Sequence, residues 1–420
     1  MDFRNIKNWT IPEGNAEIVT DANDNIIWEI PNRDYSREYF FVENLSNETA
    51  TVNVKKQLPS APSIEVFYSL NRRNWTSMGT SATNPGISTT LAPGKRMYLK
   101  ATTSAWGTSL TAYNWISVNK AFRIGGNILS LTRGDSYKSS TTLGANYIFT
   151  SLFSGNSNLT SAVDLKLPRN TTQNCYDSMF YNCTSLVDTP ELPATTLTQS
   201  CYRAMFRGCS RLVTPPELPG RIVDSCYRQM FYGCTSLATA PVLSGTTAFS
   251  CYEEMFRNCT SLVTPPELPA TTLTQGCYSG MFRGCSSLAT APVLSNTTLA
   301  LSCYGDMFRG CTALTQAPAL PATVLTEQCY RAMFYGCTGL TTAPVLAAQQ
   351  LPQSCYYEMF SGCSQLNSVT TYANDISASN CITNWLYGVA AQGDFHNLGT
   401  AVYITDSASG IPMGWTEHNS

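Results

Sequence analysis

The chain has 420 residues, a formal net charge of −2, and charged side chains at only 13% of positions. This low share of Lys and Arg argues against nucleic acid or an anionic membrane surface as the main partner. No run approaches the roughly 18 apolar residues of a membrane span, and the length allows two or three domains.

Residues 1–33 predict a short separate element. The stretch IVTDANDNIIWEI (18–30) alternates apolar and polar residues on both sides of a turn at 21–25, which is typical of a β-hairpin. A hairpin this small is marginal alone, so we expect it to attach to a neighbour or to a partner protein. Its apolar side would consist of Ile18, Ile26, Ile27 and Trp28. The opening residues lack the apolar region of a signal peptide, so we expect no general secretory export.

Residues 34–135 predict a small β-sandwich or barrel. Six segments rich in β-branched and aromatic residues alternate with turns that carry Gly, Pro and Asn. The segments that we expect to be strands are 38–45, 50–57, 63–70, 96–103, 114–124 and 127–134.

The stretch CYRAMFRGC (201–209) belongs to a motif that the chain repeats eight times, with 25 or 26 residues between successive starts. Such a period predicts a solenoid whose stacked repeats share one core. The copies begin at Cys175, Cys201, Cys226, Cys251, Cys277, Cys303, Cys329 and Cys355.

The two ends of the repeat region depart from the motif, as capping repeats do. We expect about ten coils over residues 136–395, followed by a tail at 396–420. The first coil (147–159) has Ile148 and Asn156 at the cysteine positions and Leu152 and Phe153 at the Met-Phe positions. The last coil (381–389) keeps Cys381 but has Val389 at the second cysteine position.

Within a repeat, the apolar spacing of CYxxMF fits one face of a short helix. Gly284 stands where a left-handed residue would end that helix, and an extended segment from Leu288 to Leu294 follows. Pro292 in that segment cannot donate to a ladder, so we expect a ladder of only two or three residues. The prediction is an α+β chain that ends in an α/β solenoid.

The phrases LPATTLTQSCYRAMFRGC and FRGCSSLATAPVL resemble the BspA-like leucine-rich repeats of bacterial surface antigens, over roughly residues 145–390. The resemblance implies the stacked fold and leaves the ligand open, because the repeat motif is structural.

The opening WTIPEG, the hairpin after it and the ending GIPMGWT are similar to structural proteins of gut phages and prophages. This second resemblance implies a virion protein that binds the host surface, as a possible homo-trimer. A bacterial surface adhesin is the alternative.

The cysteines allow three interpretations. Zinc would need closely spaced cysteines or nearby histidines, and the repeats have neither. Disulfides within or between coils stay open. We favour buried free thiols that act as small apolar residues, and we expect no cofactor.

Nothing in the sequence predicts an enzyme. His396 and His418 stand outside any nucleophile or metal motif, and RIGGN (123–127) lacks the third glycine of a dinucleotide site. Arg133-Gly134-Asp135 spells an adhesion tripeptide, but we interpret it as a turn.

The surface position after the repeat Phe is Tyr or Arg in seven of the eight copies. These residue types are enriched at binding hot spots, although their stems also cover core edges. We call this row the ridge: Tyr181, Arg207, Tyr232, Arg257, Arg283, Arg309 and Tyr335. Arg203, Arg228 and Arg331 could extend it. A competing row on the extended segment consists of Glu191, Glu217, Val242, Glu267 and Val293.

Overall fold

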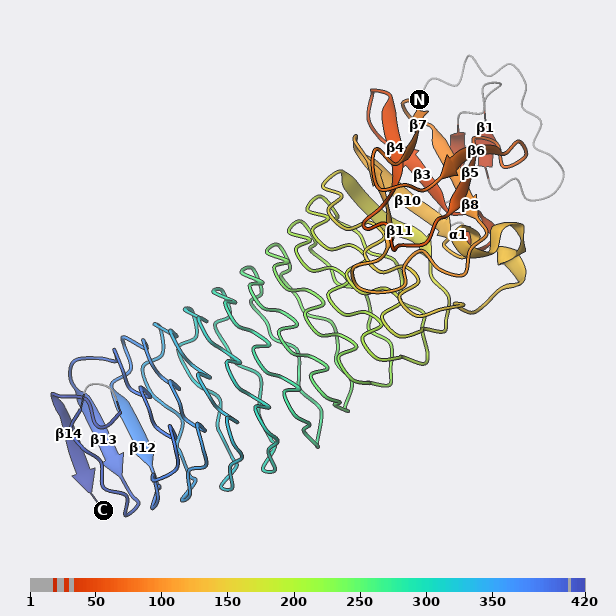
Figure 1. Cartoon of the computed structure of the whole chain (residues 1–420). Helices are drawn as coiled ribbons and strands as arrows, with labels where there is room; N and C mark the ends of the chain where they lie inside the picture. The colour runs from red at the N-terminus through yellow and green to blue at the C-terminus, as the bar shows by residue number, and fades with distance from the viewer. Residues whose placement is uncertain (1–17, 21–25, 30–33, 407–408, 420) are drawn as a thin grey trace.

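The computed structural model describes residues 18–20, 26–29, 34–406 and 409–419. Figure 1 shows a β-rich domain at the N-terminal end, from which the chain winds in successive coils toward the C-terminus. Regular structure is mostly strand, and within the described residues α-helix is confined to four residues.

The predicted hairpin is present in the backbone. β1 (Ile18–Thr20) and β2 (Ile26–Glu29) pair antiparallel, with Val19 opposite Trp28. The turn at 21–25 and the side chains of Ile18, Ile26, Ile27 and Trp28 lie outside the description.

Two sheets pack face to face in the N-terminal domain. One has the order β11-β10-β3-β8-β5-β6 and the other the order β7-β4-β9. Alternation builds the core: Ala50, Val52 and Val54 point inward from one strand, while Thr51 and Asn53 are more exposed. The strands are β3 (Phe41–Asn44), β4 (Ala50–Lys56), β5 (Glu65–Ser69), β6 (Thr76–Thr80), β7 (Ile87–Leu91), β8 (Arg96–Ala101), β9 (Asn114–Val118), β10 (Phe122–Asn127) and β11 (Leu159–Lys166).

Two sequence-based assignments in this domain are wrong. Residues 71–95, which no predicted strand covers, contain β6 and β7, and β7 begins inside the predicted turn NPGIST (84–89). Residues 127–134, read as a strand, contain α1 (Ser130–Arg133), which leads into the 3₁₀ helix η3 (Gly134–Ser139). The cause is local, because the side chain of Asn127 accepts a hydrogen bond from the Leu129 amide at 3.0 Å and turns the chain out of β10.

The domain and the repeats share one sheet. β11 belongs to the first coil and pairs parallel with β10 of the sandwich. Asn156, at a cysteine position of that coil, donates to the Ile116 carbonyl at 2.7 Å and accepts from the Val118 amide at 3.3 Å. The first coil therefore caps the stack by bonding to β9 where a preceding coil is missing.

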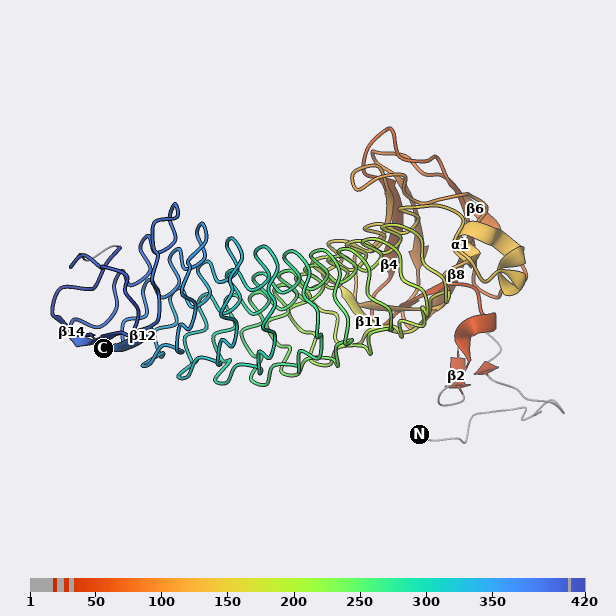
Figure 2. The same ribbon diagram turned by 90° about the horizontal axis from the view of Figure 1, so that it is seen from below.

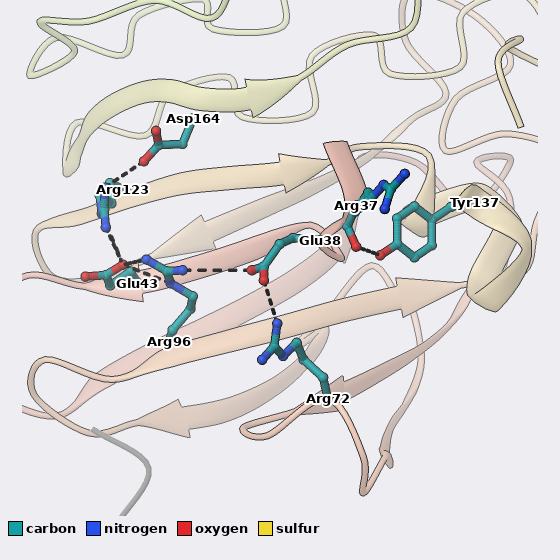
Figure 3. Close-up of polar contacts among 8 residues, drawn as sticks. All are labelled: Arg37, Glu38, Glu43, Arg72, Arg96, Arg123, Tyr137 and Asp164. Carbon is teal, nitrogen blue, oxygen red and sulfur yellow. Dashed lines mark hydrogen bonds and ion pairs between the residues drawn. The ribbon is translucent and has the colours of Figure 1, made fainter. Parts of the chain in front are cut away.

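A buried charge network crosses the same junction (Figure 3). Arg96, whose side chain is 3% exposed, contacts Glu43 at 2.8 Å and Glu38 at 3.9 Å. Arg123 bridges Glu43 at 2.9 Å and Asp164 of β11 at 2.7 Å. Since each buried charge has an opposite partner, the network fixes the first coil against the sandwich without leaving an uncompensated ion.

In the repeats, CYxxMF is not a helix, and the expected α/β character is wrong. Every fourth residue has a left-handed backbone, as at Asn174, Ser178 and Asn182. Every second amide donates three residues back, for example from Met179 to the Tyr176 carbonyl at 3.2 Å. The motif is thus a run of tight turns, and every second turn has a left-handed third residue.

The remaining amides of the motif donate to the next coil. The Tyr176 amide contacts the Cys201 carbonyl at 3.0 Å, and the Phe180 amide contacts the Met205 carbonyl at 2.9 Å. Turn bonds and coil-to-coil bonds alternate along the chain, so each coil is held to its successor. Figure 2 shows these coils lying side by side between β11 and β12 (Ser368–Thr371).

Two columns of stacked rings run through the stack. Neighbouring Phe rings lie 5.5 to 5.9 Å apart from Phe153 to Phe360. Tyr rings stack beside them from Tyr176 to Tyr356. Offset stacking at this separation adds to the burial of each ring, which contributes about 1.5–3 kcal/mol.

The second cysteine of each repeat also bonds to its neighbour. Its thiol donates to the carbonyl of the Phe in the preceding coil, as from Cys285 to Phe256 at 3.0 Å. The same contact recurs from Cys183 to Cys363 at 3.0 to 3.2 Å. All seventeen cysteines are free thiols and buried in the structure.

The extended segments barely pair. Between most coils they form isolated bridges such as Thr239 to Thr264, because a buried proline interrupts each segment. Where residues 368–371 carry no proline, β12 pairs in parallel with β13 (Gly393–Asn397) and β13 with β14 (Trp415–Asn419). The ladder is therefore narrower than expected along most of the stack and wider at its C-terminal end.

Residues of the predicted tail close the C-terminal end of the core. Trp385 occupies the Met position of the last coil and stacks on Tyr356 and Tyr403. Its indole nitrogen donates to the Gly410 carbonyl at 3.1 Å, and that of Trp415 donates to the Ala390 carbonyl at 2.7 Å. Aromatic rings with satisfied polar atoms thus cover the open face of the last repeat.

Candidate interaction surfaces

The ridge residues lie next to one another, as the repeat period predicts, and several of them pair among themselves. The Arg207 guanidinium lies between the rings of Tyr181 and Tyr232, at 5.7 and 4.3 Å. Arg257 covers Tyr232 at 5.0 Å, and Arg309 covers Tyr335 at 3.9 Å. These cation–π contacts join neighbouring coils and leave the side chains half-buried.

A polar row that sequence reasoning missed runs beside the ridge. It occupies the middle left-handed position of each repeat, where Gln229, Glu254 and Asp306 stand in different coils. Gln229 accepts from Arg207 at 2.8 Å and donates to Glu254 at 2.7 Å, and Glu254 pairs with Arg257. The residue type at this position varies from copy to copy, with Ser, Ala, Gln, Gly and acidic residues, so the sequence offered no signal for the row.

The three arginines expected to extend the ridge share one repeat position and form a row of their own. Arg203 pairs with Asp177 at 3.3 Å, and Arg228 with Glu253 at 2.7 Å. Arg331 lies over Tyr357 at 5.5 Å and also reaches Asp306 of the polar row at 3.6 Å.

The competing row on the extended segment is far more open. Val242 is 89% and Val293 81% exposed, and Glu191, Glu217 and Glu267 are exposed too. A second row follows the buried Leu of each repeat, four residues earlier, and adds the exposed side chains of Val187, Val213 and Val263. We call these two rows the valine face.

A shallow cavity of about 190 Å³ opens on the valine face between two coils. Its lining comes from two successive coils, with Ala289 and Ala291 from one and Ala317 and Pro318 from the next. Exposed valines that recur near such a hollow are typical of a surface that another molecule covers.

Hydrogen bonds hold the aspartate of the adhesion tripeptide Arg133-Gly134-Asp135. The Asp135 carboxylate accepts from Tyr39 at 2.7 Å and from Lys100 at 2.8 Å, and these hydrogen bonds lower its pKa. Gly134 and Asp135 begin η3, so the turn follows a helix rather than the expected strand. The carboxylate is committed to neighbours within its own domain.

The two histidines meet at the C-terminal sheet. The rings of His396 on β13 and His418 on β14 stack at 4.8 Å, and His418 contacts Asp394 at 2.8 Å. Among residues that the structure describes, no group of three or more His, Cys, Asp or Glu side chains could hold a metal ion. In the same part of the chain, no helix is long and apolar enough to cross a membrane.

The buried thiols are held in their protonated, unreactive form. Burial raises the pKa of Cys201 to about 11 and that of Cys285 to about 12. A protonated thiol is a poor nucleophile and a poor metal ligand, so these cysteines serve packing, and the second cysteine of each repeat also contacts a Phe carbonyl.

The model of the BspA type leucine rich repeat region matches residues 136–263, 223–341 and 278–385. Together the matches span residues 136–385, which is 250 of the 420 residues. No curated protein matches the chain, and no solved structure does. The matched span contains the repeated turns, the stacked rings and both candidate surfaces, and the chain belongs to the BspA-type leucine-rich repeat family.

Proposed function

We propose that the protein is a non-enzymatic binding protein that presents its repeats, as a solenoid of about ten coils, to a protein or glycan on a host surface. Repeats of this family indicate a protein-binding, adhesin-type role. The observation that carries the proposal is the valine face, because exposed valines that recur on several coils, with glutamates between them in one row, are typical of a surface that a partner covers.

The proposed setting is a virion, with the repeats directed outward and the N-terminal hairpin bound to another virion protein. The support is the similarity of the opening and ending segments to phage structural proteins. A homo-trimer is the assembly that we propose, as in many fibres. A bacterial cell-surface adhesin of the same family is the alternative, and the family membership fits both.

Immunogold labelling of purified particles with an antibody to the repeats tests the setting. We expect label on particles. Label on the outer surface of cells, with none on particles, would replace the virion proposal by the adhesin.

Substitution on the valine face tests the binding surface. The double variant Val242→Asp and Val293→Asp should lose most binding of the purified chain to intact host cells, because it replaces the two most exposed valines of the face by charged side chains. Val402→Asp is the matched control, since Val402 is equally open but lies beyond the repeats. Equal binding by all three proteins would reject the valine face.

A further inference from the structure

One stretch of the ridge differs from the rest. From coil to coil Tyr and Arg alternate in the N-terminal half, but Arg257, Arg283 and Arg309 follow one another without an intervening aromatic ring. Arg257 still covers Tyr232 on one side and Arg309 covers Tyr335 on the other. The middle arginine has a cation on each side.

Arg283 is the least well paired of the three. Its recorded contact among the described residues is with Asp306, at 3.7 Å. Asp306 also serves Arg309 at 3.2 Å and Arg331 at 3.6 Å, so one carboxylate is divided among three guanidinium groups. Its oxygens cannot hold all three in the paired geometry that a guanidinium prefers.

The polar row explains why carboxylates are few near Arg283. The coils on both sides carry Glu254 and Asp306 in this row, but the coil of Arg283 carries Gly280 at the same position. Four guanidinium groups here face three carboxylates: Glu254, Asp306 and Glu358, the last at 4.0 Å from Arg309. The stretch thus keeps an excess of one positive charge.

The Arg283 side chain is 33% exposed, so a ligand can reach it. Burial lowers the pKa of its guanidinium, and Arg257 and Arg309 lower it further. An added anion would relieve the repulsion among the three cations, and a planar guanidinium matches two oxygens of a carboxylate or sulfate.

We propose that Arg257, Arg283 and Arg309 form a binding site for the carboxylate or sulfate group of an acidic glycan, centred on Arg283. The site deepens the proposed binding function and rests on it, by naming a ligand class for the ridge. The rings of Tyr232 and Tyr335, covered by Arg257 and Arg309, lie at its two ends and limit the site to the three coils between them.

Titration of the purified full chain at low salt tests the site with three probes of equal length: a dextran sulfate, a polygalacturonate and a neutral dextran oligosaccharide. We expect at least one acidic probe to bind and the neutral one to fail. The two acidic arms separate sulfate from carboxylate, and raised salt should weaken the binding.

Two substitutions locate the binding. Arg283→Gln should weaken it at least tenfold, whereas Arg211→Gln, an equal charge change at an exposed arginine of another coil, should leave it unchanged. Gly280→Asp should also remove the binding, because it supplies an internal carboxylate. The fold should persist, since Glu254 and Asp306 adopt the same left-handed backbone, with φ of 53° and 55°.

Failure of both acidic probes would overturn the site, and so would equal weakening by the two arginine variants. The valine-face measurement stays separate: cell binding that survives Arg283→Gln while no acidic probe binds would reject the anion site alone. Loss of cell binding in the valine double variant with intact acidic-probe binding would confirm two independent surfaces.

Discussion

The sandwich and the repeat stack are stabilised by two different kinds of contact. The sandwich uses contacts that occur once, such as Arg96 among Glu38, Glu43 and the Phe41 ring at 3.9 Å. The stack uses a few contacts many times, with the same ring, thiol and turn in each coil. A single substitution should therefore stay local in the first region and spread to neighbours in the second.

Alkaline pH should separate the two regions most strongly, because all the cysteines lie in the repeats. Folded thiols such as Cys201 keep their protons to a pKa of about 11, against about 8.5 for an unfolded cysteine. The folded state then binds more protons, so the free energy of unfolding falls as pH rises from about 8.5 to 11. Each thiol contributes about 1.4 kcal/mol per pH unit at most, and many act together.

Thermal unfolding of the full chain between pH 7 and 10.5 measures this effect, with proteolytic cleavage sites reporting which region opens first. We expect the repeats to open first at high pH. The double variant Cys285→Ala and Cys337→Ala should show a shallower decline, since two titrating groups are gone. A melting temperature that stays level to pH 10.5 would contradict the assignment of buried thiols.

Phe256→Ala should cost about 3–5 kcal/mol, as a large-to-small change in a packed core does. Phe231 and Phe282 each lose a stacked neighbour, at 5.8 and 5.9 Å. We expect faster amide exchange in the coils on both sides as well as in the altered one. Phe249→Ala is the control, because that ring lies just before the repeat of Phe256 and is 46% exposed. Faster exchange confined to one coil would contradict the coupling.

Arg96→Met should cost about 1.5–3 kcal/mol, because Glu38 and Glu43 lose a buried hydrogen-bonding partner and keep only Arg72 and Arg123. Here we expect faster exchange in β3 and β8 and little change beyond the first coil. Arg73→Met, at an exposed position of the same domain, should shift stability by less than about 0.5 kcal/mol. Accelerated exchange far along the stack would erase the contrast between the regions.

The sequence predicted the repeated features well because the residues of each buried column recur from repeat to repeat. Cys277, Tyr278, Met281 and Phe282 are all buried as expected, yet their spacing suits a helix and a chain of four-residue turns equally. What separates the two is the left-handed backbone at Gly280 and its counterparts, and many of these are Ser, Gln or Glu. These residue types do not predict a left-handed backbone.

Features that occur once were harder to predict. The helix α1 depends on the turn that Asn127 makes, and the junction depends on Asn156 meeting β9 across a long stretch of sequence. The ridge shows both cases: the period predicts that its residues align, while the pairing of Arg283 depends on which acids the left-handed positions of neighbouring coils carry.

The smallest effect that we expect comes from the hydrogen bond between the second cysteine of a repeat and the Phe carbonyl of the preceding coil. Cys285→Ala and Cys277→Ala remove the same atoms from fully buried sites, but among the contacts recorded in the described chain Cys285 donates to the Phe256 carbonyl and Cys277 has no such bond. The first variant should therefore be less stable by about 0.5–1 kcal/mol, the value of a weak hydrogen bond. Urea denaturation of both variants gives the difference directly. Equal losses would mean that the second cysteine fills space as the first does, and that coil-to-coil cohesion resides in the rings and the backbone amides.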